Sequence, residues 1–175
     1  MKQNEKEKYT IGRVPSAVLS LFLVLFQAAQ TGIVVGVVKL PGGAQPAAAA
    51  RVVLLPPNYI EVWNKQVQTR LDNYWELFKP EFAGNKERFV EFNRLAQLES
   101  FRYITSSMRR DLGLEASKLM KEAGPGGQFE FTGIPVGTYQ LLVLATVNGQ
   151  DMIWSKAVDV QTAIPVFVDL GKPVS

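Results

Sequence analysis

Short apolar runs rich in β-branched residues, separated by turn residues, occupy both ends of the chain from residue 31 onward. The runs cover residues 33–38, 51–55, 128–131, 138–146, 153–160 and 165–170. Pro and Gly residues lie between them, together with Asn148-Gly149, a dipeptide that favours a two-residue hairpin. Six short strands at this spacing predict a β-sandwich.

Between these two groups of strands, over residues 58–123, the apolar spacing changes to three and four. In its first part the apolar positions follow Asn58, which can cap a helix, and precede Pro80, which can stop one. A second run, from about 85 to 108, has apolar residues three apart, so its apolar surface turns around the helix and can face two neighbours. Residues 111–123 predict a short third helix. The segment is therefore a predicted helical insert between strands two and three.

The strands themselves indicate where this insert packs. In a strand, neighbouring side chains point to opposite faces, and in 51–55 both Val52 and Val53 are apolar. The same holds in 33–38 and 138–146. A sheet that is apolar on both faces needs a cover, and the helical hairpin is the nearest candidate. We expect a mainly β, α+β domain, in which the hairpin covers the outer face of one sheet of an antiparallel sandwich.

Three segments of the strand regions resemble a known family. They are GVV at 36–38, QPA at 45–47 leading to ARV at 50–52, and GQFEFTGIPVGTY at 127–139. Together they resemble a carboxypeptidase regulatory-like domain, a transthyretin-like (prealbumin-like) β-sandwich that is also similar to the B-type repeats of collagen adhesins. The resemblance covers about residues 31–57 and 124–171 and implies a scaffold, because nothing in these segments is chemically reactive.

The first 29 residues have the order of a secretory signal. Polar and basic residues up to Arg13 precede an apolar run over 17–26, and small residues follow, with cleavage expected near Ala29 and Gln30. The prediction is therefore a signal peptide at 1–29 and one domain at 30–175. An uncleaved inner-membrane anchor over residues 14–38 is the alternative, and a buried N-terminal helix of the domain is a third.

Charge and composition narrow the function. There are 19 basic and 16 acidic residues, and four of the basic and two of the acidic ones lie in the first 29, so the remainder is nearly neutral and nucleic acid is not an expected partner. The chain has no Cys and no His, which excludes thiol and Ser-His-Asp catalysis, disulfides, and thiolate or His metal sites. We expect no catalytic residue, no cofactor and no metal site, and therefore no enzyme.

Aromatic residues are the remaining candidates for binding. Tyr59, Trp63, Trp75 and Trp154 can form a platform for sugars, although core packing of the hairpin on the sheet is the favoured interpretation. The prediction is an exported, non-catalytic interaction or structural module of the bacterial cell envelope whose partner is an envelope protein. The alternative is a binding module for glycans or cell-wall polymers. Contact with a membrane is expected only through an uncleaved N-terminus, and the oligomeric state is left open.

Overall fold

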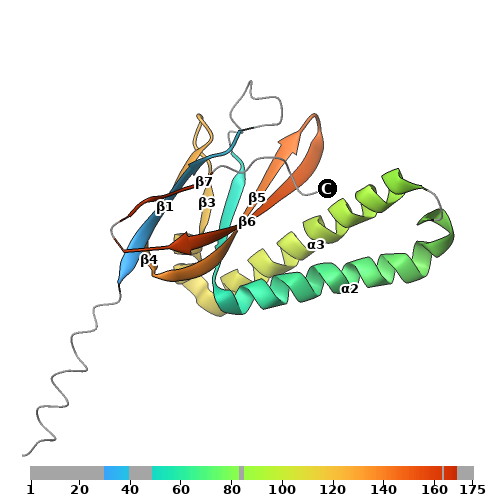
Figure 1. Ribbon diagram of the computed structural model, residues 1–175, viewed down its shortest axis with the longest axis horizontal. Helices are drawn as coiled ribbons and strands as arrows, with labels where there is room; N and C mark the ends of the chain where they lie inside the picture. The colour runs from blue at the N-terminus through green and yellow to red at the C-terminus, as the bar shows by residue number, and fades with distance from the viewer. Residues whose placement is uncertain (1–29, 40–48, 83–84, 163, 169–175) are drawn as a thin grey trace, which may run out of the picture. The chain divides into compact units, whose positions relative to one another are not determined.

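Two β-sheets and a long helical hairpin make up the part of the chain that the structure, a computed structural model, describes: residues 30–39, 49–82, 85–162 and 164–168. The elements are, in order, β1 (Thr31–Val37), β2 (Arg51–Leu55), α2 (Pro57–Phe82), α3 (Lys86–Leu112), the 3-10 turn η1 (Gly113–Glu115), α4 (Ala116–Leu119), β3 (Met120–Glu122), β4 (Gln128–Pro135), β5 (Gly137–Val147), β6 (Gln150–Val160) and β7 (Val166–Val168) (Figure 1).

One sheet has three strands in the order β4-β1-β7, and the other has four in the order β3-β2-β5-β6. Each of the six predicted strands is present. The sheets are not wholly antiparallel as predicted, because β7 runs parallel to β1. The prediction of a third helix over 111–123 is wrong at its C-terminal end. Helix α4 stops at Leu119, and the following residues form β3, which pairs with β2 at the sheet edge. The insert therefore ends at α4 rather than at residue 123.

The β5–β6 hairpin confirms the turn predicted at Asn148-Gly149. Val147 lies opposite Gln150, so the connection has two residues, and both adopt positive φ, 51° and 76°. These values belong to a type I′ turn, whose twist matches that of the strands it joins.

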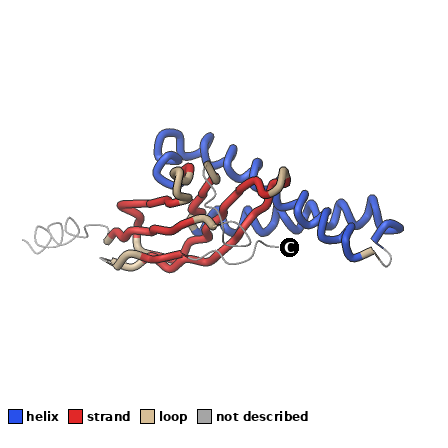
Figure 2. The backbone as a smooth tube through the Cα atoms, turned by 90° about the horizontal axis from the view of Figure 1, so that it is seen from above, coloured by secondary structure: helices blue, strands red, loops and turns tan. Residues whose placement is uncertain are grey.

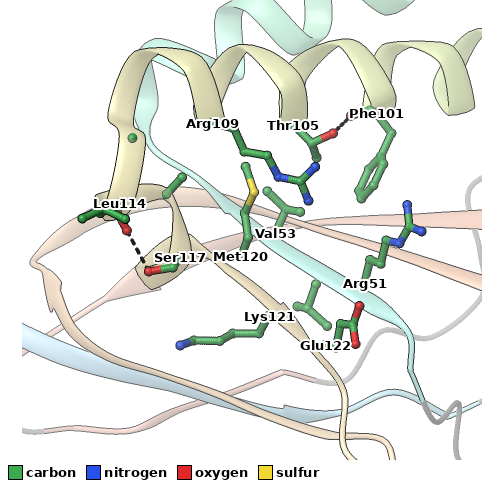
Figure 3. A pocket seen from close by; sticks show the side chains of 13 residues that line it. Arg51, Val53, Phe101, Thr105, Arg109, Leu114, Ser117, Met120, Lys121 and Glu122 are labelled. Atoms are coloured by element: carbon green, nitrogen blue, oxygen red, sulfur yellow. Dashed lines mark hydrogen bonds between the residues drawn. The ribbon is translucent and has the colours of Figure 1, made fainter.

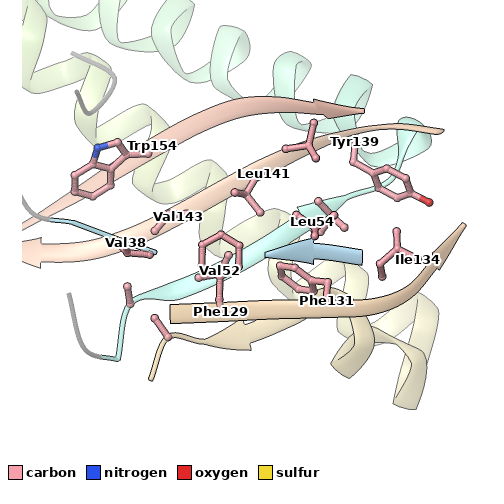
Figure 4. Packing of buried hydrophobic residues seen from close by; sticks show 14 of the residues in the cluster. Val38, Val52, Leu54, Phe129, Phe131, Ile134, Tyr139, Leu141, Val143 and Trp154 are labelled. Atoms are coloured by element: carbon pink, nitrogen blue, oxygen red, sulfur yellow. The ribbon is translucent and has the colours of Figure 1, made fainter. Parts of the chain in front are cut away.

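A first hydrophobic core fills the space between the two sheets (Figure 4). Val52 and Leu54 of β2 point into it, together with Phe131 of β4 and Trp154 of β6. Alternate residues of β2 point the other way, as strand geometry requires. The β2 strand therefore contributes to two separate cores.

The second core lies between the outer face of the four-stranded sheet and the hairpin. Its buried members come from β2, β5, β6, α2 and α3: Val53, Leu55, Leu142, Ile153, Tyr59, Trp63, Leu98, Phe101, Ile104 and Met108. The predicted cover is confirmed for this sheet. On the three-stranded sheet, Ile33 and Val37 of β1 stay exposed among the described residues, so the hairpin covers one apolar sheet face and not the other.

Proline positions shape α2 differently from the prediction. The helix begins at Pro57, and the carbonyl of Pro56 accepts hydrogen bonds from the amides of Tyr59 (2.9 Å) and Ile60 (3.2 Å). Proline suits the first helical position because no intrahelical partner is needed there, so Asn58 is not the cap. Pro80 does not stop the helix but kinks it, at a non-helical Phe78 (φ −121°, ψ 19°).

Helix α3 begins as predicted and ends later. The Asn85 side chain accepts a hydrogen bond from the amide of Arg88 at 3.2 Å, which caps the helix. The helix continues to Leu112, where Gly113 adopts a φ of 55°. Because α2 and α3 have 26 and 27 residues, more than the described strands together, the domain is an evenly mixed α+β fold and not mainly β.

The predicted signal peptide, with its cleavage near Ala29, falls on residues outside the described ranges. The alternative anchor over 14–38 is wrong in its last part, because Thr31–Val37 forms β1 between two other strands. Among the described helices, none is both long enough and apolar enough to cross a membrane.

Candidate functional site

The four aromatic residues predicted as a possible sugar platform do not lie together on the surface. Tyr59 and Trp63 are buried in the second core, and Trp154 is buried in the first. Only Trp75 is exposed, farther along α2. A shared platform is therefore wrong, because strand and helix geometry directs three of these side chains inward, as core packing requires.

Tyr59 is held at the base of the hairpin by a polar contact. Its hydroxyl donates a hydrogen bond to Asp111 Oδ2 at 3.3 Å, which links the start of α2 to the end of α3. Burial raises the pKa of the Tyr59 hydroxyl, and the nearby Asp111 carboxylate raises it further. Tyr59 thus stays protonated and structural.

The far part of the hairpin packs only helix against helix within the described residues. The second core ends at Val67 on α2 and begins at Leu98 on α3. Polar contacts with β6 continue farther out, to Arg94 of α3, which donates a hydrogen bond to the Asp151 carbonyl at 3.3 Å. The two helices then extend past the sheet, as two perpendicular views agree (Figures 1 and 2). We call residues 72–82 of α2 and 86–93 of α3 the outer hairpin.

Aromatic stacking holds the outer hairpin together. The Phe78 and Phe92 rings stack with centroids 4.9 Å apart, and Tyr74 lies 5.2 Å from Phe92. Such pairs contribute about 0.5–1.5 kcal/mol each beyond the apolar area that they bury. The apolar positions of α3 were predicted to turn around the helix and face two neighbours, and this is confirmed. Phe92 packs on α2, whereas Phe101 belongs to the core between the hairpin and the sheet.

A polar clamp joins the two helices where the outer hairpin begins. Glu99 of α3 accepts hydrogen bonds from Tyr74 Oη at 2.9 Å and from Arg70 Nε at 3.1 Å, both on α2. Burial, followed by the hydrogen bond to Glu99, raises the pKa of Tyr74 to about 12. The clamp fixes the register of the two helices on which the outer hairpin depends.

Large apolar side chains are nevertheless exposed on the outer hairpin. The exposed fractions are 72% for Leu77, 50% for Phe89, 44% for Trp75 and 37% for Val90. Most of these residues lie off the apolar stripe of their helix, so the sequence pattern did not single them out. The available signal was the number of apolar residues off the stripe, since Trp75 and Leu77 flank the line that runs through Tyr74 and Phe78.

A cavity of about 320 Å³ lies at the junction of the hairpin and β6. Trp63 forms one wall, and the polar lining residues are Asn64, Gln68, Gln97 and Ser155. Amide and hydroxyl groups beside an indole ring can hydrogen-bond sugar hydroxyls while the ring packs on the apolar face of the sugar. Trp63 is the one predicted platform residue that this cavity brings next to polar partners.

Acidic side chains do not gather into a metal site within the described ranges: no three of them lie close enough to hold an ion. The charged residues of α2 and α3 instead form solvated pairs, such as Arg88 with Glu91 at 3.0 Å. Pairs of this kind contribute little to stability.

Comparison with known proteins gives distant structural similarity and no family. No protein-family model matches the chain, and no curated protein matches it in sequence. A "putative carbohydrate binding protein" from Pseudomonas aeruginosa aligns over 85% of this chain and 94% of its own, at 16% identity and a TM-score of 0.36.

Two pilus structures from Streptococcus pneumoniae show a structural similarity that is equally weak. The pilus backbone aligns over 75% of this chain and 34% of its own, at 12% identity and a TM-score of 0.30. The full-length major pilin aligns over 75% and 26%, at 13% identity and a TM-score of 0.29. The chain thus spans about a third of these proteins or less. The resemblance to carboxypeptidase regulatory-like domains stays a prediction.

Proposed function

We propose that this chain is a non-catalytic interaction module of the bacterial cell envelope that binds a partner protein through its outer hairpin. The observation that carries the proposal is the exposure of Trp75, Leu77, Phe89 and Val90 on the part of the hairpin that does not contact the sheet. Apolar surface of this kind is unfavourable in water, at about 25 cal/mol per Å², unless a partner covers it.

The construction of the outer hairpin supports a docking role. Its two helices are held in register by the Glu99 clamp and by the stacked Phe78 and Phe92 rings. A rigid helical pair presents side chains to a partner without a large loss of conformational entropy on binding. Apolar side chains from two neighbouring helices suit a hydrophobic groove or another helix.

Export to the envelope is a separate part of the proposal. It is supported by the charged, apolar and small-residue order of the first 29 residues. N-terminal sequencing of the protein purified from its own cells tests it. A chain beginning near Gln30 in the exported fraction agrees with the proposal, and an intact Met1 in the soluble cytoplasmic fraction contradicts it.

Site-specific photocrosslinking tests the docking role. A benzophenone amino acid at Leu77 is expected to give a crosslinked partner in cells of the source organism. The same residue at Ile164, an apolar side chain that is 59% exposed outside the hairpin, serves as the matched control and is expected to give none. The change Phe89→Gln should lower the yield at Leu77.

Two results contradict docking through the outer hairpin. One is a crosslink of equal yield from Leu77 and Ile164. The other is a yield at Leu77 that Phe89→Gln leaves unchanged while circular dichroism shows the helices intact.

A second candidate function, glycan binding, is supported by the cavity beside Trp63. Asn64 and Gln68 line it and are exposed, so their substitution by Ala should leave the fold intact. If the cavity binds glycans, retention in polysaccharide affinity gels is lost in N64A/Q68A and kept in W75A. Retention lost only in W75A moves binding to the outer hairpin, and no retention of the wild type on cell-wall polysaccharide refutes this candidate.

A further inference from the structure

A larger cavity, of about 530 Å³, lies on the opposite end of the hairpin from its tip, where the end of α3 and the η1–α4 turn meet strands β2 and β3. Its apolar lining includes Val53 of β2, Phe101 of α3 and Met120 of β3, and Leu114 and Ala116 of the η1–α4 turn add to it (Figure 3). Its volume falls within the range of about 300–1,000 Å³ that is usual for small-molecule sites.

Basic side chains dominate the charge of this cavity. Arg51 begins β2, Arg109 lies in the last turn of α3 and Lys121 lies in β3, whereas Glu122 is the single acidic residue of the lining. Figure 3 shows Arg109 extending from the helix into the space above Val53, while the Lys121 ammonium group points away from it. The two arginines therefore set the charge of the site from two different elements.

Neither arginine forms a close ion pair with the described part of the chain. Within the described ranges, no carboxylate lies within 4.0 Å of the Arg51 or Arg109 guanidinium group. Of the nearby acidic residues, Asp111 pairs with Arg110 at 2.9 Å and Glu115 pairs with Lys118, whereas Glu122 lies directly opposite Arg51 in the register of β2 and β3. The negative end of the α3 dipole offsets part of the charge of Arg109, and the Glu122 carboxylate, across from Arg51 on β3, offsets part of the charge of Arg51.

Guanidinium groups beside an apolar surface favour one kind of ligand. Each group presents parallel N–H donors that match the two oxygens of a carboxylate. The apolar side chains beneath accommodate a ligand body that water solvates poorly. A carboxylate with a flat or branched apolar body meets both requirements at once.

We propose that the cavity between α3, β2 and β3 binds a small organic carboxylate, whose acid group pairs with Arg109 and Arg51 and whose apolar body lies against Val53, Phe101 and Met120. The cavity shares no residue with the outer hairpin. This site is therefore independent of the proposed docking function and is tested separately.

Isotope-labelled methionine methyl groups report on this site directly. Met120 lines the cavity, whereas Met152 packs against the first core and serves as an internal control. Titration of the full chain with 2-naphthoate is expected to shift the Met120 methyl resonance to saturation and to leave Met152 unchanged. The neutral analogue 2-naphthalenemethanol has nearly the same shape and should bind about tenfold more weakly or worse, because it cannot form the charge-assisted pairs.

Variants separate a built site from general attraction to a basic surface. R51Q and R109Q should each lower the affinity for 2-naphthoate by about tenfold. E122Q should raise the affinity, because a competing negative charge is removed. K118Q is the matched control: Lys118 is a nearby exposed cation that does not line the cavity, and its loss should leave the affinity unchanged. All four positions are exposed, and the Met152 resonance reports whether each variant is folded.

The proposal is overturned by any of four results: no Met120 shift up to about 5 mM 2-naphthoate, equal affinity for the neutral analogue, unchanged affinity in both arginine variants, or equal weakening by K118Q. Inorganic phosphate that binds as tightly as 2-naphthoate also overturns it, because the apolar body would then contribute nothing.

Discussion

Ile104→Ala tests whether the hairpin and the four-stranded sheet form one cooperative unit. Ile104 lies on α3, is fully buried and belongs to the core between the hairpin and the sheet. The change removes three carbon atoms, which at about 0.8 kcal/mol per buried group accounts for about 2.4 kcal/mol. Incomplete collapse of the resulting cavity raises the expected loss in unfolding free energy to about 3–4 kcal/mol.

Thermal unfolding followed by far-UV circular dichroism measures this loss, and a fall in Tm of about 10 °C is expected for a domain of this size. Hydrogen exchange then localises it: amides of both α3 and β5 should lose protection together. Phe89→Ala, on the half-exposed outer hairpin, is the control and should cost no more than about 1 kcal/mol, with increased exchange confined to the hairpin tip.

A loss below about 1 kcal/mol in I104A would refute the packing argument. So would exchange that rises in α3 while β5 keeps its full protection, because the hairpin would then unfold without exposing the sheet.

Three further perturbations probe single contacts. Gly32→Ala should destabilise the fold by at least about 2 kcal/mol by denaturant unfolding, because a Cβ there would lie 2.3 Å from the Gln161 carbonyl oxygen; a neutral result contradicts the close approach. Tyr139→Phe removes the 2.9 Å hydrogen bond to the Pro135 carbonyl, and a loss of about 1 kcal/mol is expected in the same assay; no loss would mean that the bond is not formed in solution. Tyr74→Phe tests pH dependence: since the folded pKa, about 12, exceeds the ordinary 10, the stabilisation is fully present below pH 10 and is lost as pH rises through 12. The stability difference between wild type and Y74F should shrink over that interval, and a constant difference would refute the shift.

Strand patterning carried much of the fold prediction. The apolar residues at both even and odd positions of 51–55 correctly indicated two separate cores, with the hairpin covering one of them. The three-residue β3 was not predictable in this way. A strand this short has too few residues for a period of two to be seen, and its pairing with β2 decides its conformation.

Prolines show why local signals were incomplete. Pro80 was predicted to stop a helix, but the stacking of Phe78 on Phe92 of α3 holds the chain in place across the kink. Asn58 had a suitable side chain for a cap, yet the helix begins at Pro57, two residues earlier than a cap at Asn58 would place it. In both cases, contacts or neighbours outside the local pattern decided the outcome.

The sequence shows which residue types are available for the candidate sites, but it does not show which of those residues lie close together in space. The cavity with Arg51 and Arg109 joins the start of a strand to the end of a helix 58 residues later. No periodicity connects positions so far apart. Only the pairing of β2 with β3 and the packing of α3 on the sheet bring them to the same space.

The sequence by itself determined six of the strands and the two long helices, because hydrophobic period and turn residues act locally. It also determined that one sheet needs a cover, because the apolar faces of a strand follow from alternation alone. Only the tertiary structure decided which aromatic side chains are buried, which apolar side chains the hairpin leaves exposed, and which basic side chains share a cavity. These properties depend on how far two helices extend past a sheet edge and on contacts between distant residues, and local patterning records neither.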